Sequence, residues 1–270
     1  MAACKKVAFI NGKGGVGKTT SIFHVAGVLS ARGEKTLIID LDKQRNTTNT
    51  FLMETEAPPR GAGAGTMFDF MKGTAAPEEA VRKSYFRSRG NASPKYYNID
   101  VMPSDIRFEF EVLLEDIDIK GPLERFVQGN GYTWLLVDMP PSNRMLNEIC
   151  FSQIVDFVIV PFSSDFYSLE GYSDLIDTVN RAREHNANLN IIGVYLARYF
   201  ENCKVDKYIR DKMGMFGKLY MDIYIPVRVD IRESVMYGRP MSYYRRNSSS
   251  TRAYERLVDA MEQRIAQFRR

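Results

Sequence analysis

Near its start the chain contains the octapeptide Gly12-Lys13-Gly14-Gly15-Val16-Gly17-Lys18-Thr19. It satisfies the pattern G-x-x-x-x-G-K-[ST], and it lies between an apolar run at residues 5–11 and a helical pattern at about residues 19–31. Glycines let consecutive backbone N–H groups turn toward one point, and the N-terminus of the following helix adds partial positive charge. We therefore expect a loop that cradles phosphate groups.

Two side chains of the octapeptide have the chemistry that a nucleoside triphosphate requires. We expect Lys18 to reach the β- and γ-phosphate oxygens, and the Thr19 hydroxyl to bind the Mg²⁺ that bridges the same oxygens. Such a Mg²⁺ also needs a carboxylate at the end of a neighbouring strand. Asp138 follows one apolar run, and Asp40 and Asp42 end another, so the sequence offers candidates at two strand ends.

Apolar runs and helical patterns alternate along the whole chain. The first run, the glycine-rich turn, the helix and a second run at residues 36–40 form a βαβ unit, whose crossover is right-handed. This alternation predicts an α/β fold, a doubly wound and mostly parallel sheet with helices on both faces. Further strands are expected at residues 99–102, 134–137, 157–160 and 191–196, and helices at residues 169–183 and 205–213.

The length of 270 residues fits one large α/β domain or two small ones. We interpret residues 1–270 as a single domain because strands continue on both sides of the least regular stretch, residues 54–65, which is rich in Gly and Pro. That stretch is expected to be a mobile surface loop. A C-terminal helix is expected near residues 250–268, docked through an apolar face formed by Ala253, Leu257, Met261 and Ile265.

Composition excludes several other classes of protein. No apolar run reaches 18 residues and no signal-peptide pattern is present, so we expect a cytoplasmic protein. The three cysteines, Cys4, Cys150 and Cys203, are far apart and fit neither a disulfide framework nor a metal site. The net charge of +4 is uneven: residues 196–270 hold 16 Lys and Arg against 9 Asp and Glu. A basic C-terminal third attracts polyanions, although a solvated face has the same composition.

Three motifs, in order, resemble those of the deviant Walker A ATPases of the ParA/Soj type, which are relatives of MinD. Lys13-Gly14-Gly15-Val16-Gly17-Lys18-Thr19-Thr20 resembles K-G-G-x-G-K-[ST]-[ST], with Lys13 as the signature lysine. Asp40-Leu41-Asp42-Lys43-Gln44-Arg45-Asn46 resembles the switch element D-x-D-P-Q-x-N. Leu135-Leu136-Val137-Asp138-Met139-Pro140-Pro141-Ser142 resembles the Walker B segment. Weaker likeness continues to Gly238-Arg239-Pro240, so the resemblance covers almost the whole chain.

The resemblance implies an ATPase that dimerises on ATP, with ATP and Mg²⁺ as cofactors. It implies that Lys13 crosses the dimer interface to the partner's ATP, that Asp42 positions the attacking water, and that Asp138 holds Mg²⁺. It also places Pro226 and Arg228 where the chain passes the adenine. The expected ATP-binding residues of the loop are Gly12, Lys13, Gly14, Gly15, Val16, Gly17, Lys18, Thr19 and Thr20.

The switch element departs from the family pattern at two positions. Lys43 and Arg45 stand where the family usually has proline and a small residue, so the chain loses a fixed φ and gains two cations. These cations bind DNA, bind the acidic groups of a partner, or are simply solvated. The resemblance therefore does not fix the rate of ATP hydrolysis or the way in which that rate is regulated.

For the function, the resemblance implies DNA partitioning, in plasmid or chromosome segregation, by a nucleoid-associated homodimer. Non-specific DNA binding needs only clustered cations, and the predicted DNA-binding residues are Arg228, Arg232, Arg245 and Arg246. The position where several family members carry a basic residue holds Asp230 here. A ParB-like or centromere-binding protein is the expected partner, and no operator-reading domain is expected in the short stretch before the first strand.

Two alternative functions remain open on the same motifs. One is a ParA-like ATPase that positions a cargo other than DNA. The other is a MinD-like ATPase at a membrane, which needs an amphipathic C-terminal anchor. Residues 264–270 are too polar for a good anchor, so no stable membrane association is expected.

Overall fold

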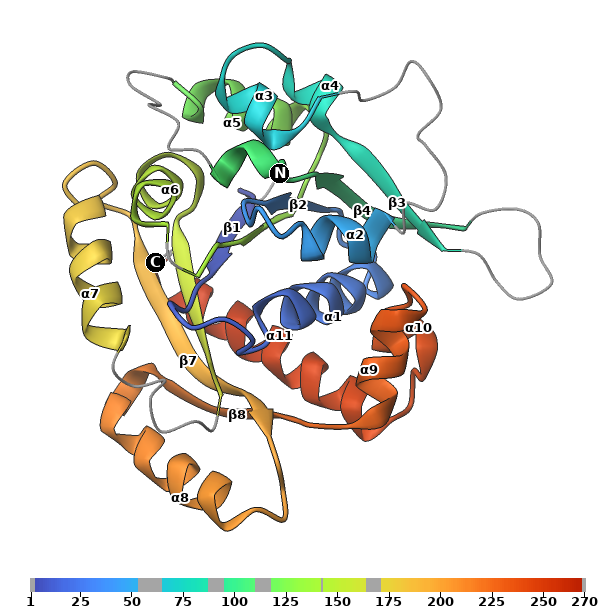
Figure 1. The fold of residues 1–270 in the computed structure, drawn as a ribbon, viewed down its shortest axis with the longest axis vertical. Helices are drawn as coiled ribbons and strands as arrows, with labels where there is room; N and C mark the ends of the chain where they lie inside the picture. The colour runs from blue at the N-terminus through green and yellow to red at the C-terminus, as the bar shows by residue number, and fades with distance from the viewer. Residues whose placement is uncertain are drawn as a thin grey trace.

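The computed structural model describes residues 3–52, 65–86, 95–109, 118–141, 143–163 and 171–268. Of the mobile loop predicted near residues 54–65, only Gly65 lies within the described residues. The described elements form one eight-stranded sheet with helices on both sides (Figure 1). The predicted α/β class is therefore confirmed.

The sheet has the strand order β3-β4-β2-β5-β1-β6-β7-β8, and every neighbouring pair is parallel except β3 and β4. All residues of β2, β5 and β6 are buried, as expected for central strands that helices cover on both faces. The strands are β1 (Lys5–Phe9), β2 (Thr36–Asp40), β3 (Arg82–Phe86), β4 (Lys95–Met102), β5 (Trp134–Asp138), β6 (Phe157–Ser163), β7 (Asn190–Tyr199) and β8 (Tyr220–Pro226).

Helices divide between the two faces according to the two hydrophobic cores of the protein. One core packs α1 (Lys18–Ala31), α2 (Asn46–Leu52), α9 (Val229–Met236), α10 (Met241–Tyr244) and α11 (Ser249–Phe268) on the sheet. The other core packs α3 (Met67–Met71), α4 (Pro77–Ala80), α5 (Lys120–Gly129), α6 (Arg144–Ile149), α7 (Gly171–Ala182) and α8 (Lys204–Lys212). Short helical turns are η1 (Ile106–Glu109), η2 (Cys150–Ile154) and η4 (Met213–Leu219).

The C-terminal helix docks on the sheet as its sequence predicts. Ala253, Leu257, Met261 and Ile265 are all buried, and they share a core with residues of α1. Figure 1 shows α11 lying beside α1 on one face of the sheet. Each buried leucine, isoleucine or methionine of such a stripe contributes about 1.5–3 kcal/mol of transfer free energy.

Helix α1 comes very close to the segment that precedes α10. A Cβ atom added at Gly27 would lie 2.1 Å from the Cβ of Pro240, so only glycine fits at this position. Three residues earlier, the imidazole Nδ1 of His24 accepts a hydrogen bond from the backbone N–H of Met241, at 3.2 Å. Helix α1 and the start of α10 are therefore tightly packed against each other.

Candidate functional site

The predicted phosphate loop, residues 12–19, connects the carboxyl end of β1 to the start of α1. Gly15 and Gly17 have φ angles of 75° and 102°, a left-handed region that residues with a Cβ rarely adopt. These two glycines are therefore required by the backbone of the loop itself.

Lys18 lies inside this loop and is 7% exposed. Its ammonium Nζ donates to the backbone carbonyl oxygens of Asn11 and Lys13, at 3.1 and 3.4 Å. Burial lowers the pKa of Lys18, while the negative charges of Asp138 and Asp42 oppose that shift. An anion in the loop would stabilise the buried ammonium in the same way.

Asp138, at the end of β5, lies beside the first turn of α1 and is 1% exposed. Its Oδ2 accepts hydrogen bonds from the hydroxyls of Thr19, at 2.6 Å, and Thr47, at 2.5 Å. Its Oδ1 is buried and has no hydrogen-bond partner among the residues described. Burial raises the pKa of Asp138, and the two hydroxyls and the Lys18 ammonium oppose that shift.

The orphaned oxygen of Asp138 fits the site of a magnesium ion. Mg²⁺ takes oxygen ligands in octahedral geometry, and it is commonly held by one or two carboxylates together with phosphate oxygens and water. Thr19 supplies a hydroxyl next to the carboxylate of Asp138. In the part of the chain that the structure describes, no group of three His, Cys, Asp or Glu side chains could hold a metal alone. A Mg²⁺ ion here would therefore take its remaining ligands from phosphate oxygens and water.

Asp40, the other acid at a strand end, has a different environment. Its Oδ2 accepts from both the backbone N–H and the hydroxyl of Thr48, and its Oδ1 accepts from the backbone N–H of Asp42. Burial, together with the nearby charge of Asp138, raises the pKa of Asp40 to about 7. Asp40 thus anchors the segment that follows β2, and between the two strand ends Asp138 is the better metal ligand.

The segment between β2 and α2, residues 42–45, is named here the switch segment. The carboxylate of Asp42 accepts a hydrogen bond from the backbone N–H of Gln44, at 3.0 Å. The backbone carbonyl oxygen of Asp42 accepts another from the backbone N–H of Arg45, at 2.8 Å. Arg45 has a φ of 56°, a left-handed conformation that is uncommon for residues other than glycine. The switch segment is therefore a tight turn that leaves Asp42 partly exposed.

Lys13 lies at the rim of the phosphate loop, where its side chain is half-buried. Its backbone N–H donates to the side-chain carbonyl of Asn11, at 2.9 Å, and the Asn11 amide donates to the carbonyl of Pro161 on β6, at 2.8 Å. Asn11 therefore ties the loop to the neighbouring strand. Sequence reasoning missed Asn11, Thr47 and Thr48, because nothing in their local pattern indicates the distant residues that they contact.

Pro226 and Arg228 lie at the same carboxyl edge of the sheet as the phosphate loop. Pro226 pairs with Tyr199 at the end of β7. Arg228 precedes α9, and its guanidinium donates to the carboxylate of Glu201 at 2.6 Å. The proximity to adenine expected for these two residues stays a prediction.

The other predicted DNA-binding residues lie on or next to α9 and α10. Arg232 and Arg246 are exposed. Arg245 lies 3.8 Å from a carboxylate oxygen of Glu233 and stacks on the ring of Tyr244. Asp230 accepts from the hydroxyl of Ser250, so this acid fixes the first turn of α11. We refer to Arg228, Arg232, Arg245 and Arg246 together as the arginine surface.

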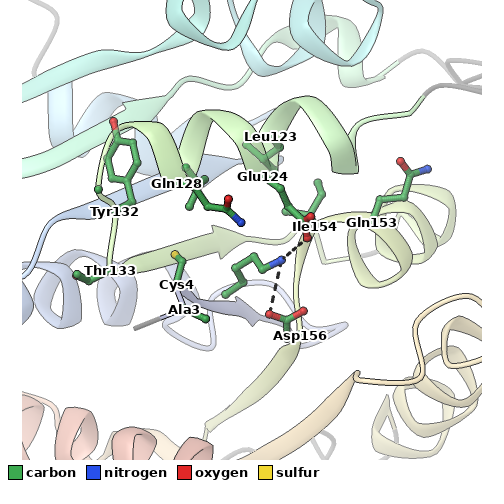
Figure 2. Close-up of a pocket in the computed structure, with 13 residues that line it drawn as sticks. Ala3, Cys4, Leu123, Glu124, Gln128, Tyr132, Thr133, Gln153, Ile154 and Asp156 are labelled. Atoms are coloured by element: carbon green, nitrogen blue, oxygen red, sulfur yellow. Dashed lines mark hydrogen bonds and ion pairs between the residues drawn. The ribbon is translucent and has the colours of Figure 1, made fainter. Parts of the chain in front are cut away.

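A cavity of about 790 Å³ lies at the opposite, amino edge of the sheet (Figure 2). Lys6 lines it, and its ammonium contacts the carboxylates of Glu124, at 3.1 Å, and Asp156, at 3.7 Å. Residues of α5 and η2, with Cys4 and Thr133, form much of its wall. None of the predicted nucleotide-binding residues lines this cavity.

In the described part of the chain, no helix is both long and apolar enough to cross a membrane.

Comparisons with known proteins agree with this geometry. The chromosome partitioning protein ParA of Caulobacter vibrioides is 29% identical over 266 residues, which cover 93% of this chain and 91% of that protein. Two solved structures share the fold: cobyrinic acid a,c-diamide synthase from Mycobacterium smegmatis with bound ADP and magnesium, and the cell division ATPase MinD of Pyrococcus furiosus. Their TM-scores are 0.74 and 0.72, and their identities are 19% and 21%. The first match covers 97% of this chain and 96% of the other, and the second covers 96% and 98%.

The family model described as an AAA domain matches residues 4–191, more than half of the chain. That match includes the phosphate loop, the switch segment and Asp138, the three parts of the site that the structure brings together. The chain therefore belongs to this AAA-domain family and is a P-loop ATPase of the ParA/MinD superfamily.

Proposed function

We propose that this chain is a partitioning ATPase that dimerises on ATP, binds DNA without sequence preference and releases it on hydrolysis. The observation that supports it most is the convergence of Lys18, Thr19 and Asp138 at the start of α1, with one carboxylate oxygen still unpartnered. Similarity to a chromosome partitioning protein along nearly the whole chain gives this ATP site its biological context. The whole of residues 1–270 would act as one domain.

In this proposal the phosphate loop binds ATP and orients its terminal phosphate. The backbone N–H groups of residues 12–19 and the Lys18 ammonium contact the phosphate oxygens. Thr19 and Asp138 would hold Mg²⁺, directly or through water, and the metal would supply positive charge next to the phosphates. Asp42, which is partly exposed in the switch segment, orients the attacking water. Pro226, at the end of β8, and Arg228 would contact the adenine.

A second subunit would complete the site through Lys13. Lys18 already places one cation inside the loop, so a second lysine on the rim is best used across an interface, on the partner's nucleotide. There its charge would stabilise the transition state of phosphoryl transfer, as an arginine finger does. Hydrolysis would then require the dimer, and a ParB-like or centromere-binding protein would stimulate it.

The arginine surface would carry the DNA. Phosphate contacts need only clustered cations, and each neutralised phosphate releases a counterion, so such binding weakens steeply with salt. Helix α1 starts at the phosphate loop and packs through Gly27 and His24 against Pro240 and Met241, at the start of α10. This packing offers a physical link between the nucleotide and the arginines. Association with the nucleoid would follow from such binding.

The experiment that tests the proposal is binding to random-sequence duplex DNA, measured by fluorescence anisotropy with ATP, ADP and no nucleotide across a salt series. We expect tight DNA binding with ATP but not with ADP or without nucleotide, and we expect the affinity to fall steeply as the salt concentration rises. Protein that hydrolyses ATP but binds no DNA in any of the three states would contradict the DNA assignment. Sedimentation with anionic liposomes, and a search for a protein cargo, would then test the alternative MinD-like and cargo-positioning functions.

A further inference from the structure

Thr47 is a buried residue that no motif of the sequence singles out. It lies in the first turn of α2, directly after the switch segment, and it is 0% exposed. Its hydroxyl donates to Oδ2 of Asp138 at 2.5 Å, across 91 positions of the sequence. Most buried hydroxyl groups have a hydrogen-bond partner, so the bond alone would mean little. Here, however, the acceptor is Asp138, the strand-end carboxylate better suited to hold Mg²⁺.

Two threonines from two different helices orient the same carboxylate oxygen. Thr19 donates to Oδ2 from α1, and Thr47 donates to it from α2. With Oδ2 held by two donors, the plane of the carboxylate is fixed and Oδ1 is left without a partner among the described residues. Removing one donor would let Asp138 rotate toward other partners, because a single hydrogen bond does not fix the torsion of a carboxylate.

The adjacent residue makes a parallel contact to the other acid. The hydroxyl of Thr48 donates to Oδ2 of Asp40 at 2.7 Å and accepts from the backbone N–H of Ser104 at 2.9 Å. Asp40 and Asp138 are register partners on β2 and β5. The first turn of α2 is thus anchored to two neighbouring strand ends, and of its two threonines only Thr47 binds Asp138.

We propose that Thr47 is a positioning residue, which orients Asp138 for Mg²⁺ and thereby couples metal binding to α2 and the switch segment. This inference rests on the proposed function, because it assumes that Asp138 holds the Mg²⁺ of bound ATP. Outer-shell partners of metal ligands change metal affinity by about 10- to 100-fold when they are lost. Mg²⁺ bound next to Asp138 would in turn order α2, because Thr47 connects the two.

The test measures the Mg²⁺ concentration that gives half-maximal binding of a fluorescent N-methylanthraniloyl ATP. We expect Thr47→Val to raise this concentration about tenfold and Thr47→Ser, which keeps the hydroxyl, to change it less than about twofold. Binding of the same nucleotide in EDTA should be equal in wild type and variants. Thr47→Ala is made in parallel, so that a poorly folded valine variant does not decide the outcome.

Thr48→Val is the matched control, because it removes a buried hydroxyl from the same helix turn but not from Asp138. A second readout is hydrogen exchange of residues 46–52. Mg²⁺ with ATP should slow their exchange in wild type and Thr47→Ser, and much less in Thr47→Val and Thr47→Ala.

Three outcomes would overturn the inference. They are an unchanged Mg²⁺ requirement in both Thr47→Val and Thr47→Ala, a serine variant as impaired as these two, or an equal shift in Thr48→Val. Failure of the wild type to bind the nucleotide, with or without Mg²⁺, would instead overturn the proposed function.

Discussion

At the ends of β2 and β5, Asp40 and Asp138 are buried and held by hydroxyl groups, whereas the four side chains of the arginine surface face solvent. Asp138 and Asp40 are nearly inaccessible, and each has hydroxyl donors at fixed positions. Arg232 and Arg246 are exposed. A buried polar group that loses its hydrogen-bond partner lowers the stability of the folded protein by about 1–3 kcal/mol, whereas an exposed ion pair adds only about 0–1 kcal/mol to that stability. One substitution among the buried acids and their partners should therefore have a large effect. On the arginine surface, several substitutions together would be needed for an effect of the same size.

Helix α1 is the mechanical connection between these two regions. Its first residue, Lys18, lies in the phosphate loop, and nine residues later Gly27 lies against Pro240. If nucleotide controls the arginine surface, the simplest route is a rigid movement of this helix.

The largest effect is expected at Lys13. Lys13→Ala should lower the rate of ATP hydrolysis at least about 100-fold, because it removes a charge that stabilises the transition state. ATP binding, followed by isothermal calorimetry, should stay within a few-fold of wild type. An equal mixture of Lys13→Ala and Asp42→Ala proteins should hydrolyse ATP faster than the sum of the two alone. Wild-type turnover by Lys13→Ala would refute a role for Lys13 in trans.

The next effect concerns the contact between α1 and Pro240. Gly27→Ala places a methyl group where only 2.1 Å is available, so the free energy of unfolding should fall by about 1–3 kcal/mol. Thermal unfolding followed by circular dichroism would show a midpoint lower by about 2–4 °C per kcal/mol. Gly129→Ala is the control, since a Cβ there meets nothing within 4 Å. Equal stabilities of the two variants would show that α1 and this segment are not rigidly packed.

His24 gives this contact a dependence on pH. Burial lowers the pKa of His24 to about 3, so the folded protein keeps it neutral while the unfolded chain binds a proton near pH 6.5. The unfolded state then binds more protons between these values, and stability falls as the pH is lowered through that range. From pH 7 to pH 5 wild type should lose about 1–2 kcal/mol more than His24→Gln.

Urea unfolding at the two pH values measures this difference. His185→Gln is the matched control for loss of a histidine, because His185 is exposed. If His24→Gln lost as much stability on acidification as wild type, the pH dependence would arise elsewhere in the protein.

The smallest effects are expected on the arginine surface. Charge reversal at Arg232 or Arg246 should weaken ATP-dependent DNA binding about threefold to tenfold and lower the salt slope by about one. Arg228 and Arg245 should contribute less, because DNA must compete with Glu201 and Glu233 for them. Arg181→Glu makes the same change of charge on α7, on the opposite face of the sheet, and should leave binding unchanged. Equal losses of DNA affinity in all five arginine variants would mean that binding depends only on the net charge of the protein.

Sequence reasoning recovered the elements whose signals are local. The bounds predicted for β2, residues 36–40, match the structure, and the phosphate loop is marked by its own glycines. It missed β3 and β8, which are the two edge strands. In β8 only Ile225 and Pro226 are buried, so the continuous apolar run that identifies a central strand is absent. Thr47 was missed because its contact with Asp138 depends on two distant segments meeting.

Trp134 is the only tryptophan of the chain, and it is fully buried. It is the first residue of β5, and Asp138 is the last. A strand rises about 3.3 Å per residue, so about 13 Å of backbone separates the indole from the metal-side carboxylate. The ring is covered by the ammonium of Lys5 at the amino edge of the sheet. Its intrinsic fluorescence should consequently follow global unfolding and respond little to ATP, which provides an internal optical control for every binding measurement on this protein.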